Sequence, residues 1–326
     1  MKVTQLWRFP VKSMGGTEVE AVRIDRRGVH ADRLWAVRDV EKGATASARR
    51  VPALLGCSAR YTDEPGDDAG PGNVPQVVIT FPDGRELACD DPAVNDALTE
   101  LAGREMRLVA LPPAGDTSQH RMLMQASVAN FSASQVREDL NLGQSDDLPD
   151  ATMFTTRQII TLARYTTPPG TFVDLSPVHL LSTASLLSLA ADGTPYDVRR
   201  FRPNVLVDAG NGDPFPESAW VGGEVELGAV TLRVTNPTIR CVVPTRPQPG
   251  IERDTGISRL LAERTDRFLG VYADVATAGV VRVGDEVRAH RSSRTGALKR
   301  ATSAASRAAT RGAQRLLEAT VLREKS

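Results

Sequence analysis

The sequence predicts an α+β protein that is mainly β, with a small β-rich N-terminal domain, a second barrel-like domain and a basic tail that is helical or disordered. Short runs of alternating or β-branched residues recur through most of the chain, separated by Gly and charged turns. Their regular spacing favours a barrel or a strongly curved sheet. At 326 residues the chain is long enough for two modest domains. We place the three parts at residues 1–112, 113–288 and 289–326.

The N-terminal domain is predicted to contain strands and one helix. Pro82-Asp83-Gly84 is typical of a hairpin turn. Asp91-Pro92 is expected to start a short helix that ends at Gly103. The segment Asp63–Pro75 is rich in Gly, Pro and Asp, which indicates an exposed loop. The expected strands are Met1–Phe9, Glu18–Asp25, Arg33–Val40, Gln76–Phe81, Arg85–Cys89 and Arg107–Leu111.

The second domain is predicted to be a succession of strands with two short helices. Ser182 or Thr183 is expected to cap a helix that runs to Ala191, and Ser258–Arg264 forms the other. The polar, acidic segment Asn141–Asp150 indicates a second loop. The expected strands are Asn204–Asp208, Glu224–Leu227, Val230–Val234, Phe268–Val275 and Val280–Val283.

Composition limits the classes of partner and of compartment. Hydrophobic residues at 41% and charged residues at 25% are typical of globular proteins, and sparse aromatics at 5% predict a mainly aliphatic core. The net charge of zero gives no argument for nucleic acid as a partner. The chain has no run of 18 apolar residues, so no spanning helix is expected. Its start lacks the apolar core of a signal peptide, so we expect a cytoplasmic protein.

The cysteines argue against a disulfide framework. Cys57, Cys89 and Cys241 lie far apart and form no CxxC motif, as expected of a protein in a reducing compartment. Three thiols are too few for an iron–sulfur cluster held by cysteine alone, which needs four. No flavin motif is present either, so we expect neither cofactor in this chain.

The tail differs in charge from the rest of the chain. Between residues 291 and 326 there are nine Lys and Arg residues against two acids, Glu318 and Glu324, which gives about +7 and leaves about −7 for the remainder. Two interpretations stay open. The tail is either a solvated, partly disordered segment, or an amphipathic helix that makes weak contact with an anionic membrane or an acidic partner. The basic residues are Arg291, Arg294, Lys299, Arg300, Arg307, Arg311, Arg315, Arg323 and Lys325.

Cys241 is the residue on which the chemistry is expected to depend. It follows the alternating run Val230–Val234, and Arg240 stands beside it. A thiolate is a nucleophile or a soft metal ligand, and an adjacent cation lowers the thiol pKa. The alternative is that Cys241 is a small buried hydrophobe. Upstream, Arg200-Phe201-Arg202-Pro203-Asn204 adds cationic and amide groups before another strand, which indicates a site for an anionic cofactor.

A set of short strings, in order across roughly residues 1–288, resembles MOSC-domain proteins, which are related to the C-terminal domain of molybdenum cofactor sulfurases. The layout is most similar to the two-part family that includes the amidoxime-reducing components. Each string alone is weak, but their joint order is specific. The strings are Phe9-Pro10-Val11-Lys12-Ser13, Asp32-Arg33-Leu34-Trp35, Ser47-Ala48-Arg49 with Pro52, Pro177-Val178-His179-Leu180-Leu181-Ser182-Thr183-Ala184-Ser185-Leu186, the Arg-Phe-Arg-Pro-Asn run, Arg240-Cys241, and Val281-Arg282-Val283-Gly284-Asp285.

The resemblance implies a molybdenum-pyranopterin cofactor held between the two domains, with Cys241 as a ligand of the metal. Lys12, Ser13, Arg33 and Arg49 would bind its phosphate, since they offer charges and a hydroxyl. The alternative is that these residues are ordinary loop and strand-end side chains.

Four further positions complete the expected site. Arg202 and Asn204 are two residues apart and would share one side of a strand, for phosphate and pterin respectively. Arg240 would stabilise the thiolate or the pterin, and Asp174 would relay protons near the metal. His179 lies in an apolar run and is expected to be a satisfied structural histidine rather than a ligand. Thr238 departs from the cysteine or serine often found in the family, which leaves the surroundings of the ligand open.

The leading hypothesis is an oxidoreductase that reduces small N-hydroxylated substrates with electrons from a separate ferredoxin or flavoprotein. An alternative from another class is a cofactor carrier or a sulfur-transfer module with a persulfide on Cys241. The chain has no room for the pyridoxal-phosphate domain that accompanies the MOSC part in cofactor sulfurases. A third interpretation, an interaction protein that uses the basic tail, predicts no bound metal.

Overall fold

The computed structural model describes residues 1–121, 133–140, 142, 154, 158, 161, 164–190, 192–210 and 212–290. The predicted loop Asn141–Asp150, apart from residue 142, and the predicted tail from Arg291 lie outside the described residues. In the described ranges, no helix combines the length and the apolar character needed to cross a membrane. The fold is mainly β, as the sequence predicts, with its strands in four sheets.

The largest sheet has eight strands, and only β11 and β12 among them pair in parallel. A parallel pair needs a crossover, which here contains the helix α5 (Thr183–Leu189). The strands in spatial order are β17 (Val287–His290), β13 (Glu224–Leu227), β14 (Val230–Ile239), β15 (Phe268–Thr277), β11 (Val178–Ser182), β12 (Val205–Asp208), β1 (Lys2–Arg8) and β2 (Thr17–Val19).

This sheet curls back on itself. Val3 N donates to Asp285 O at 2.9 Å and Val287 N donates to Met1 O at 2.9 Å, so the start of β1 meets the start of β17. The enclosed core is aliphatic, with Leu6, Leu180 and Val271 all fully buried. The first strand of the chain therefore completes a sheet made mostly from its second half, across the predicted boundary at residue 112.

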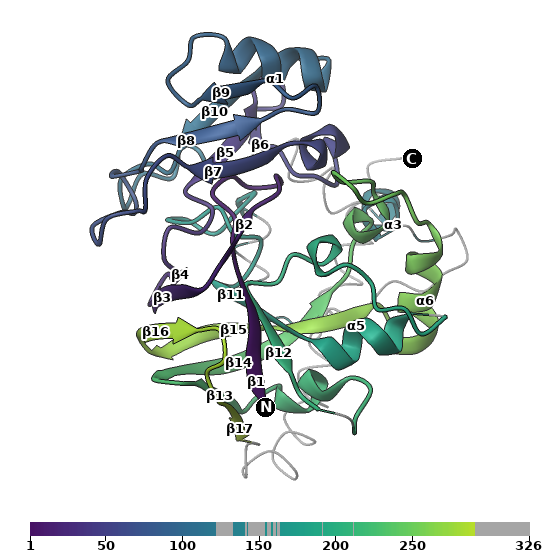
Figure 1. The fold of residues 1–326 in the computed structure, drawn as a ribbon. Helices are drawn as coiled ribbons and strands as arrows, with labels where there is room; N and C mark the ends of the chain where they lie inside the picture. The colour runs from purple at the N-terminus through teal and green to yellow at the C-terminus, as the bar shows by residue number, and fades with distance from the viewer. Residues whose placement is uncertain are drawn as a thin grey trace, which may run out of the picture.

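Three smaller sheets of three strands each come mainly from the first part of the chain, and Figure 1 shows two of them with α1 at one end of the molecule. Their strands are β10 (Met106–Ala110), β5 (Trp35–Asp39) and β6 (Ala44–Thr45); β16 (Gly279–Arg282), β3 (Ala21–Asp25) and β4 (Gly28–Val29); and β7 (Ser58–Tyr61), β8 (Val77–Thr80) and β9 (Glu86–Ala88).

Local signals placed the helix ends well. The helix α1 (Val94–Ala102) ends at Gly103, whose φ of 69° is the left-handed conformation that glycine adopts easily. Its N-cap is Ala93 rather than Asp91, although Asp91 Oδ1 accepts a hydrogen bond from Ala93 N at 2.8 Å. Ser182, of the two predicted alternatives, caps α5 by accepting from Ser185 N. The other helices in the described ranges are α3 (Ala133–Leu140) and α6 (Gly256–Thr265), and the 3-10 turns there are η1 (Pro52–Gly56), η3 (Val198–Arg200), η4 (Pro216–Trp220) and η5 (Val243–Thr245).

Two strand predictions near the expected site were wrong. The strand β14 continues to Ile239 rather than ending at Val234, with register irregularities between Val234 and Asn236 and between Pro237 and Ile239. Such irregularities let a strand carry a proline, which has no N–H to donate. Arg202 is not on a strand at all, because it adopts a left-handed φ of 55° after η3. Arg202 and Asn204 therefore do not share the face of a strand.

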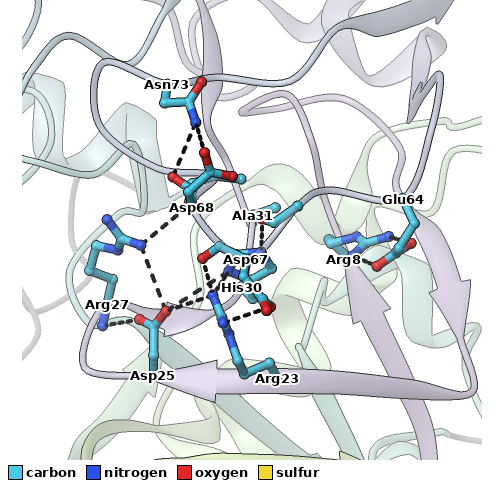
Figure 2. Close-up of polar contacts among 12 residues, drawn as sticks. Arg8, Arg23, Asp25, Arg27, His30, Ala31, Glu64, Asp67, Asp68 and Asn73 are labelled. Atoms are coloured by element: carbon cyan, nitrogen blue, oxygen red, sulfur yellow. Dashed lines mark hydrogen bonds and ion pairs between the residues drawn. The ribbon is translucent and has the colours of Figure 1, made fainter.

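The predicted loop Asp63–Pro75 is irregular, as expected, but it is anchored rather than wholly exposed. Arg8 forms a two-pronged ion pair with Glu64 at 2.7 and 2.8 Å. Arg23 donates to Asp67 Oδ1 at 2.9 Å and to Asp67 O at 2.7 Å (Figure 2). His30 Nε2 lies 3.0 Å from Gly66 O. These contacts fix the loop against β1, β3 and β4, and Ala69 is buried beneath it.

Candidate functional site

One cleft brings together all nine residues proposed from the sequence. It holds about 810 Å³ of empty space, counting its open mouth, and its lining includes segments from both ends of the chain. The residues in question are Lys12, Ser13, Arg33, Arg49, Asp174, Arg202, Asn204, Arg240 and Cys241. Their convergence is a tertiary property, because the chain between Arg49 and Asp174 supplies none of these nine residues.

The cleft is formed where strands end. Lys12 and Ser13 follow β1, and Arg33 follows β4. On the other side, Arg202 and Asn204 lie between η3 and β12, and Cys241 follows β14 by two residues. Because β1 and β12 are neighbours in the large sheet, their adjacent segments meet at one rim.

An ion pair between Lys12 Nζ and Asp174 Oδ1 crosses the cleft. Lys12 also donates to Phe172 O at 3.1 Å, and its side chain is only 5% exposed, whereas that of Asp174 is 72% exposed. Burial lowers the pKa of Lys12, and the pairing with Asp174 offsets only part of that effect. Enclosure by the cleft would raise the pKa of Asp174, but the charge and hydrogen bond of Lys12 outweigh it and lower that pKa. The carboxylate of this pair faces solvent, and the ammonium group lies beneath it.

The Ser13 side chain is held in place by one hydrogen bond, but its hydroxyl can still donate another. Its Oγ accepts from Ala48 N at 2.9 Å, which leaves the hydroxyl proton for another acceptor. Its backbone adopts a left-handed φ of 72°. Arg33 and Arg202 have φ values of 52° and 55°, so three cleft residues that are not glycine hold this uncommon conformation. Such local strain often clusters at functional sites.

The Arg49 side chain connects the N-terminal half to a helix that sequence reasoning missed. Asp139, on α3, accepts from Arg49 Nη1 at 2.9 Å and from Arg50 Nη2 at 3.2 Å. The Asp139 carbonyl also accepts from Val242 N at 2.9 Å, next to Cys241. Asp139 is 8% exposed. No pattern in the sequence distinguishes this aspartate from the solvent-facing acids of a helix, so only the fold identifies it.

Arg240 is buried beside Cys241 and is held by two acceptors. Its Nη1 donates to Phe201 O at 3.1 Å and its Nη2 to His179 Nε2 at 3.0 Å. Burial lowers the pKa of Arg240 to about 10, so the guanidinium stays charged at neutral pH. The other ring nitrogen of His179 lies 3.3 Å from Arg202 O, so His179 is the satisfied histidine that the sequence predicts.

Asn204 already uses its side chain within the protein. Its Oδ1 accepts from His179 N at 3.2 Å and its Nδ2 donates to Trp7 O at 3.3 Å. These bonds join β1, β11 and the start of β12 at the floor of the cleft. Asn204 is only 1% exposed and lines the cleft. The structure therefore gives its side chain a positioning role.

Cys241 carries a free, half-buried thiol. The charge of Arg240 acts on this thiol in the predicted direction, towards a lower pKa, but the net shift of the pKa is upward. Burial raises the pKa of Cys241, and the charges of Arg49 and Arg240, with a backbone hydrogen bond from Val243, offset it only in part. A soft metal ion would deprotonate such a thiol by binding it.

The side chains of the cleft suit an anionic ligand that brings a soft metal. Six cationic side chains line the cleft with one carboxylate, that of Asp174; the six are Lys12, Arg33, Arg49, Arg200, Arg202 and Arg240. In the part of the chain that the structure describes, two buried atoms of the cleft arginines, Arg202 Nη2 and Arg240 Nε, have no hydrogen-bond partner, and neither has the nearby Thr238 Oγ1. Among the residues that the structure describes, no three His, Cys, Asp or Glu side chains gather to hold a metal ion by themselves. Cys241 is thus the one sulfur that the described lining of the cleft offers. A metal bound here needs further ligands from the cofactor that carries it.

Two family models match the chain. The MOSC N-terminal beta barrel domain covers residues 1–110 and the MOSC domain covers residues 168–288. Among curated proteins, mitochondrial amidoxime-reducing component 1 of Mus musculus is 27% identical over 318 residues, which cover 87% of this chain and 81% of that protein. Component 2 of Bos taurus is 24% identical over 303 residues, which cover 87% and 82%.

Solved structures add distant likenesses. The YUAD protein from Bacillus subtilis aligns with a TM-score of 0.40 and 11% identity, over 88% of this chain and 93% of that one. YiiM from Geobacillus stearothermophilus aligns with a TM-score of 0.29 and 14% identity, over 36% and 55%.

Proposed function

Because the chain belongs to the MOSC family, with the N-terminal and MOSC domains in tandem, we propose that it is a molybdenum-cofactor oxidoreductase that reduces N-hydroxylated compounds. The observation that carries the proposal is the meeting of a free thiol, Cys241, with six cationic side chains in one cleft. The amidoxime-reducing components that the chain resembles supply the class of substrate.

The residues present fit a pyranopterin cofactor that carries molybdenum and a phosphate. Lys12, Arg33, Arg49 and Arg202 supply positive charge for the phosphate, and Ser13 supplies a hydroxyl proton. Cys241 supplies a sulfur ligand for the metal. When bound, the cofactor supplies two-electron redox chemistry at its metal.

The protein's part in the reaction is orientation and proton supply. Reduction of an N–OH group to N–H consumes two electrons and two protons and releases water. Lys12 Nζ holds a proton against Asp174 Oδ1, and this carboxylate is largely exposed to solvent. The pair can therefore pass protons from solvent into the cleft. Arg240 stays charged beside Cys241 and favours the thiolate form of that residue.

Electrons are proposed to come from a separate ferredoxin or flavoprotein, since the sequence offers three cysteines and no flavin motif. A cytoplasmic location belongs to the same proposal, and cell fractionation with an antibody against the chain tests it. Recovery of the native protein in an organelle or membrane fraction would contradict this location.

The deciding experiment measures molybdenum by mass spectrometry in wild-type protein and in Cys241→Ala, both purified from a host that makes the cofactor. We expect near-stoichiometric molybdenum in the wild type, with loss of metal or an altered metal spectrum in the variant. Loaded wild type should then oxidise a reduced dye when an N-hydroxylated compound is added. A folded wild type without molybdenum would exclude the reductase and favour a sulfur-transfer role for Cys241.

A further inference from the structure

Two arginines that line the cleft, from distant parts of the chain, lie against the same aromatic ring. The guanidinium carbon of Arg33 is 4.8 Å from the centroid of the Phe9 ring, and that of Arg202 is 4.4 Å from it. Both distances are within the range of about 6 Å in which a cation is attracted to an aromatic face. Arg33 comes from the first part of the chain and Arg202 from the second, so the ring bridges two segments that line one cleft.

The Phe9 ring is fixed by its surroundings. Its residue is 2% exposed, Phe9 N donates to Asp32 Oδ1 at 2.8 Å, and Phe9 O accepts from Arg33 N at 2.7 Å. Gly16 leaves the ring its space, because a Cβ at that position would lie 2.6 Å from Phe9 Cδ1. A ring this constrained can serve as a fixed surface for the Arg33 and Arg202 side chains.

The two arginines need such a surface because little else in the described part of the chain holds Arg202. Arg33 forms an ion pair with Asp32, its neighbour in sequence. Arg202 has no ion-pair partner among the described residues, and its Nη2 is buried without an acceptor. Burial, joined by the nearby charge of Arg33, lowers the pKa of Arg202 to about 9. Two like charges thus stand close together in a poorly solvated place.

Both arginines also hold left-handed backbone conformations, with φ of 52° for Arg33 and 55° for Arg202. This conformation is unfavourable for a residue with a long side chain, so the surrounding structure must enforce it. The two arginines thus repel each other, hold strained backbones and leave Arg202 Nη2 without an acceptor. These three features are unfavourable in the empty cleft, and binding of a negatively charged group would offset them.

We propose that Phe9 is a positioning residue that holds Arg33 and Arg202 as a preformed pair for a phosphate group. This inference rests on the proposed function, because the phosphate is that of the proposed cofactor. Phe9 makes no contact with the metal ligand Cys241 that the structure records. Its effect is on anion affinity, through the two guanidinium groups.

The test compares Phe9→Leu with a matched control, Phe81→Leu, in the full-length protein. Phe81 is also a buried phenylalanine with an arginine near its ring, at 5.9 Å, but that arginine, Arg85, does not line the cleft. Calorimetric titration with inorganic phosphate, on proteins purified from a host that does not make the cofactor, should show about five- to tenfold weaker binding for Phe9→Leu and wild-type binding for Phe81→Leu. Molybdenum content should fall in the first variant only. Thermal unfolding checks that both variants fold.

Fluorinated phenylalanine at position 9 separates the ring's charge distribution from its shape. Mono-, di- and trifluorinated rings weaken cation attraction stepwise with little change of size, so phosphate affinity should fall in that order. The proposal is overturned if these variants and Phe9→Leu bind phosphate like the wild type, or if the wild type binds no phosphate. If phosphate binding depends on Phe9 but wild-type protein carries no molybdenum, the positioning role stands and the proposed function fails. If the wild type and Phe9→Leu carry the same amount of molybdenum, the proposed function stands and the positioning role of Phe9 fails.

Discussion

Arg240 donates a hydrogen bond from Nη2 to Nε2 of His179 across 3.0 Å. A guanidinium cannot accept a hydrogen bond, so Nε2 must be the acceptor and the proton of the neutral ring must sit on Nδ1. There it points at the carbonyl of Arg202, which accepts it. Burial and the charge of Arg240 lower the pKa of His179 well below 6.5, so the ring stays neutral. His179 therefore positions Arg240 beside Cys241.

Removing this acceptor should destabilise the protein. In His179→Leu the buried Nη2 of Arg240 loses its partner, and we expect a loss of about 1–3 kcal/mol in the free energy of unfolding. His179→Gln keeps an acceptor and should lose less. Urea unfolding at pH 7 measures both. Equal stability of the two variants would show that the hydrogen bond to Arg240 is not what matters at this position.

Acid should weaken the fold through His120. This residue is fully buried, Nδ1 lies 2.8 Å from Thr167 Oγ1, and burial lowers the pKa of His120 from 6.5 to about 4. Below pH 6.5 the unfolded chain takes up a proton that the folded chain refuses until about pH 4, so stability is lost across that window. Between pH 7 and pH 5 the loss from this group is about 2 kcal/mol.

Urea unfolding at both pH values, in wild type and in His120→Asn, isolates this contribution from that of other groups. The variant should show a shallower pH dependence between pH 7 and 5. Identical pH dependence in the two proteins would contradict the assignment to His120.

Substitutions at Lys12 and Asp174 should affect two different steps, cofactor binding and proton supply. Lys12→Met removes a buried charge at the anion site, and we expect molybdenum content to fall about tenfold. Asp174→Asn keeps the shape of the side chain, so molybdenum content should remain while kcat falls about 10- to 100-fold. Metal analysis and dye-driven turnover check the two variants. A loss of metal in Asp174→Asn would mean that the aspartate acts on binding instead.

Asp139 should be needed for an ordered cleft. Asp139→Asn weakens the contacts to Arg49 and Arg50, and we expect about 1–3 kcal/mol less stability with faster amide exchange in α3. Glu138→Gln, one residue earlier on the exposed side of the helix, is the matched control and should leave exchange unchanged. Protection in α3 that responds alike to both changes would remove Asp139 as the connecting residue.

Deletion of residues 291–326 tests the basic tail as a docking segment for the electron donor. If the tail attracts an acidic donor, the deletion should slow donor-driven turnover several-fold at low salt, and the difference should disappear at high salt. Dye-driven turnover should be unchanged. A donor-driven rate that is independent of the deletion at low salt would leave the tail without this role.

Local sequence signals were sufficient for much of the fold. Pro82-Asp83-Gly84 gave its hairpin and Gly103 its helix end, because turn and cap preferences depend on a few adjacent residues. The mainly β character followed from alternation over short runs. The strand β14 was misjudged because its register irregularities, which accommodate Pro237, depend on pairing with β15.

For the site too, the sequence predicted which residues take part, whereas their contacts depend on the tertiary structure. The nine polar and thiol side chains were selected by residue type together with the resemblance of short, ordered strings to MOSC-domain proteins, and all nine line the cleft. The sequence could not show that Asp139 connects Arg49 to the Cys241 segment, that Phe9 carries two arginines, or that burial raises the pKa of Cys241. Those features arise from contacts between residues far apart in the chain, and burial and electrostatic energies depend on such contacts.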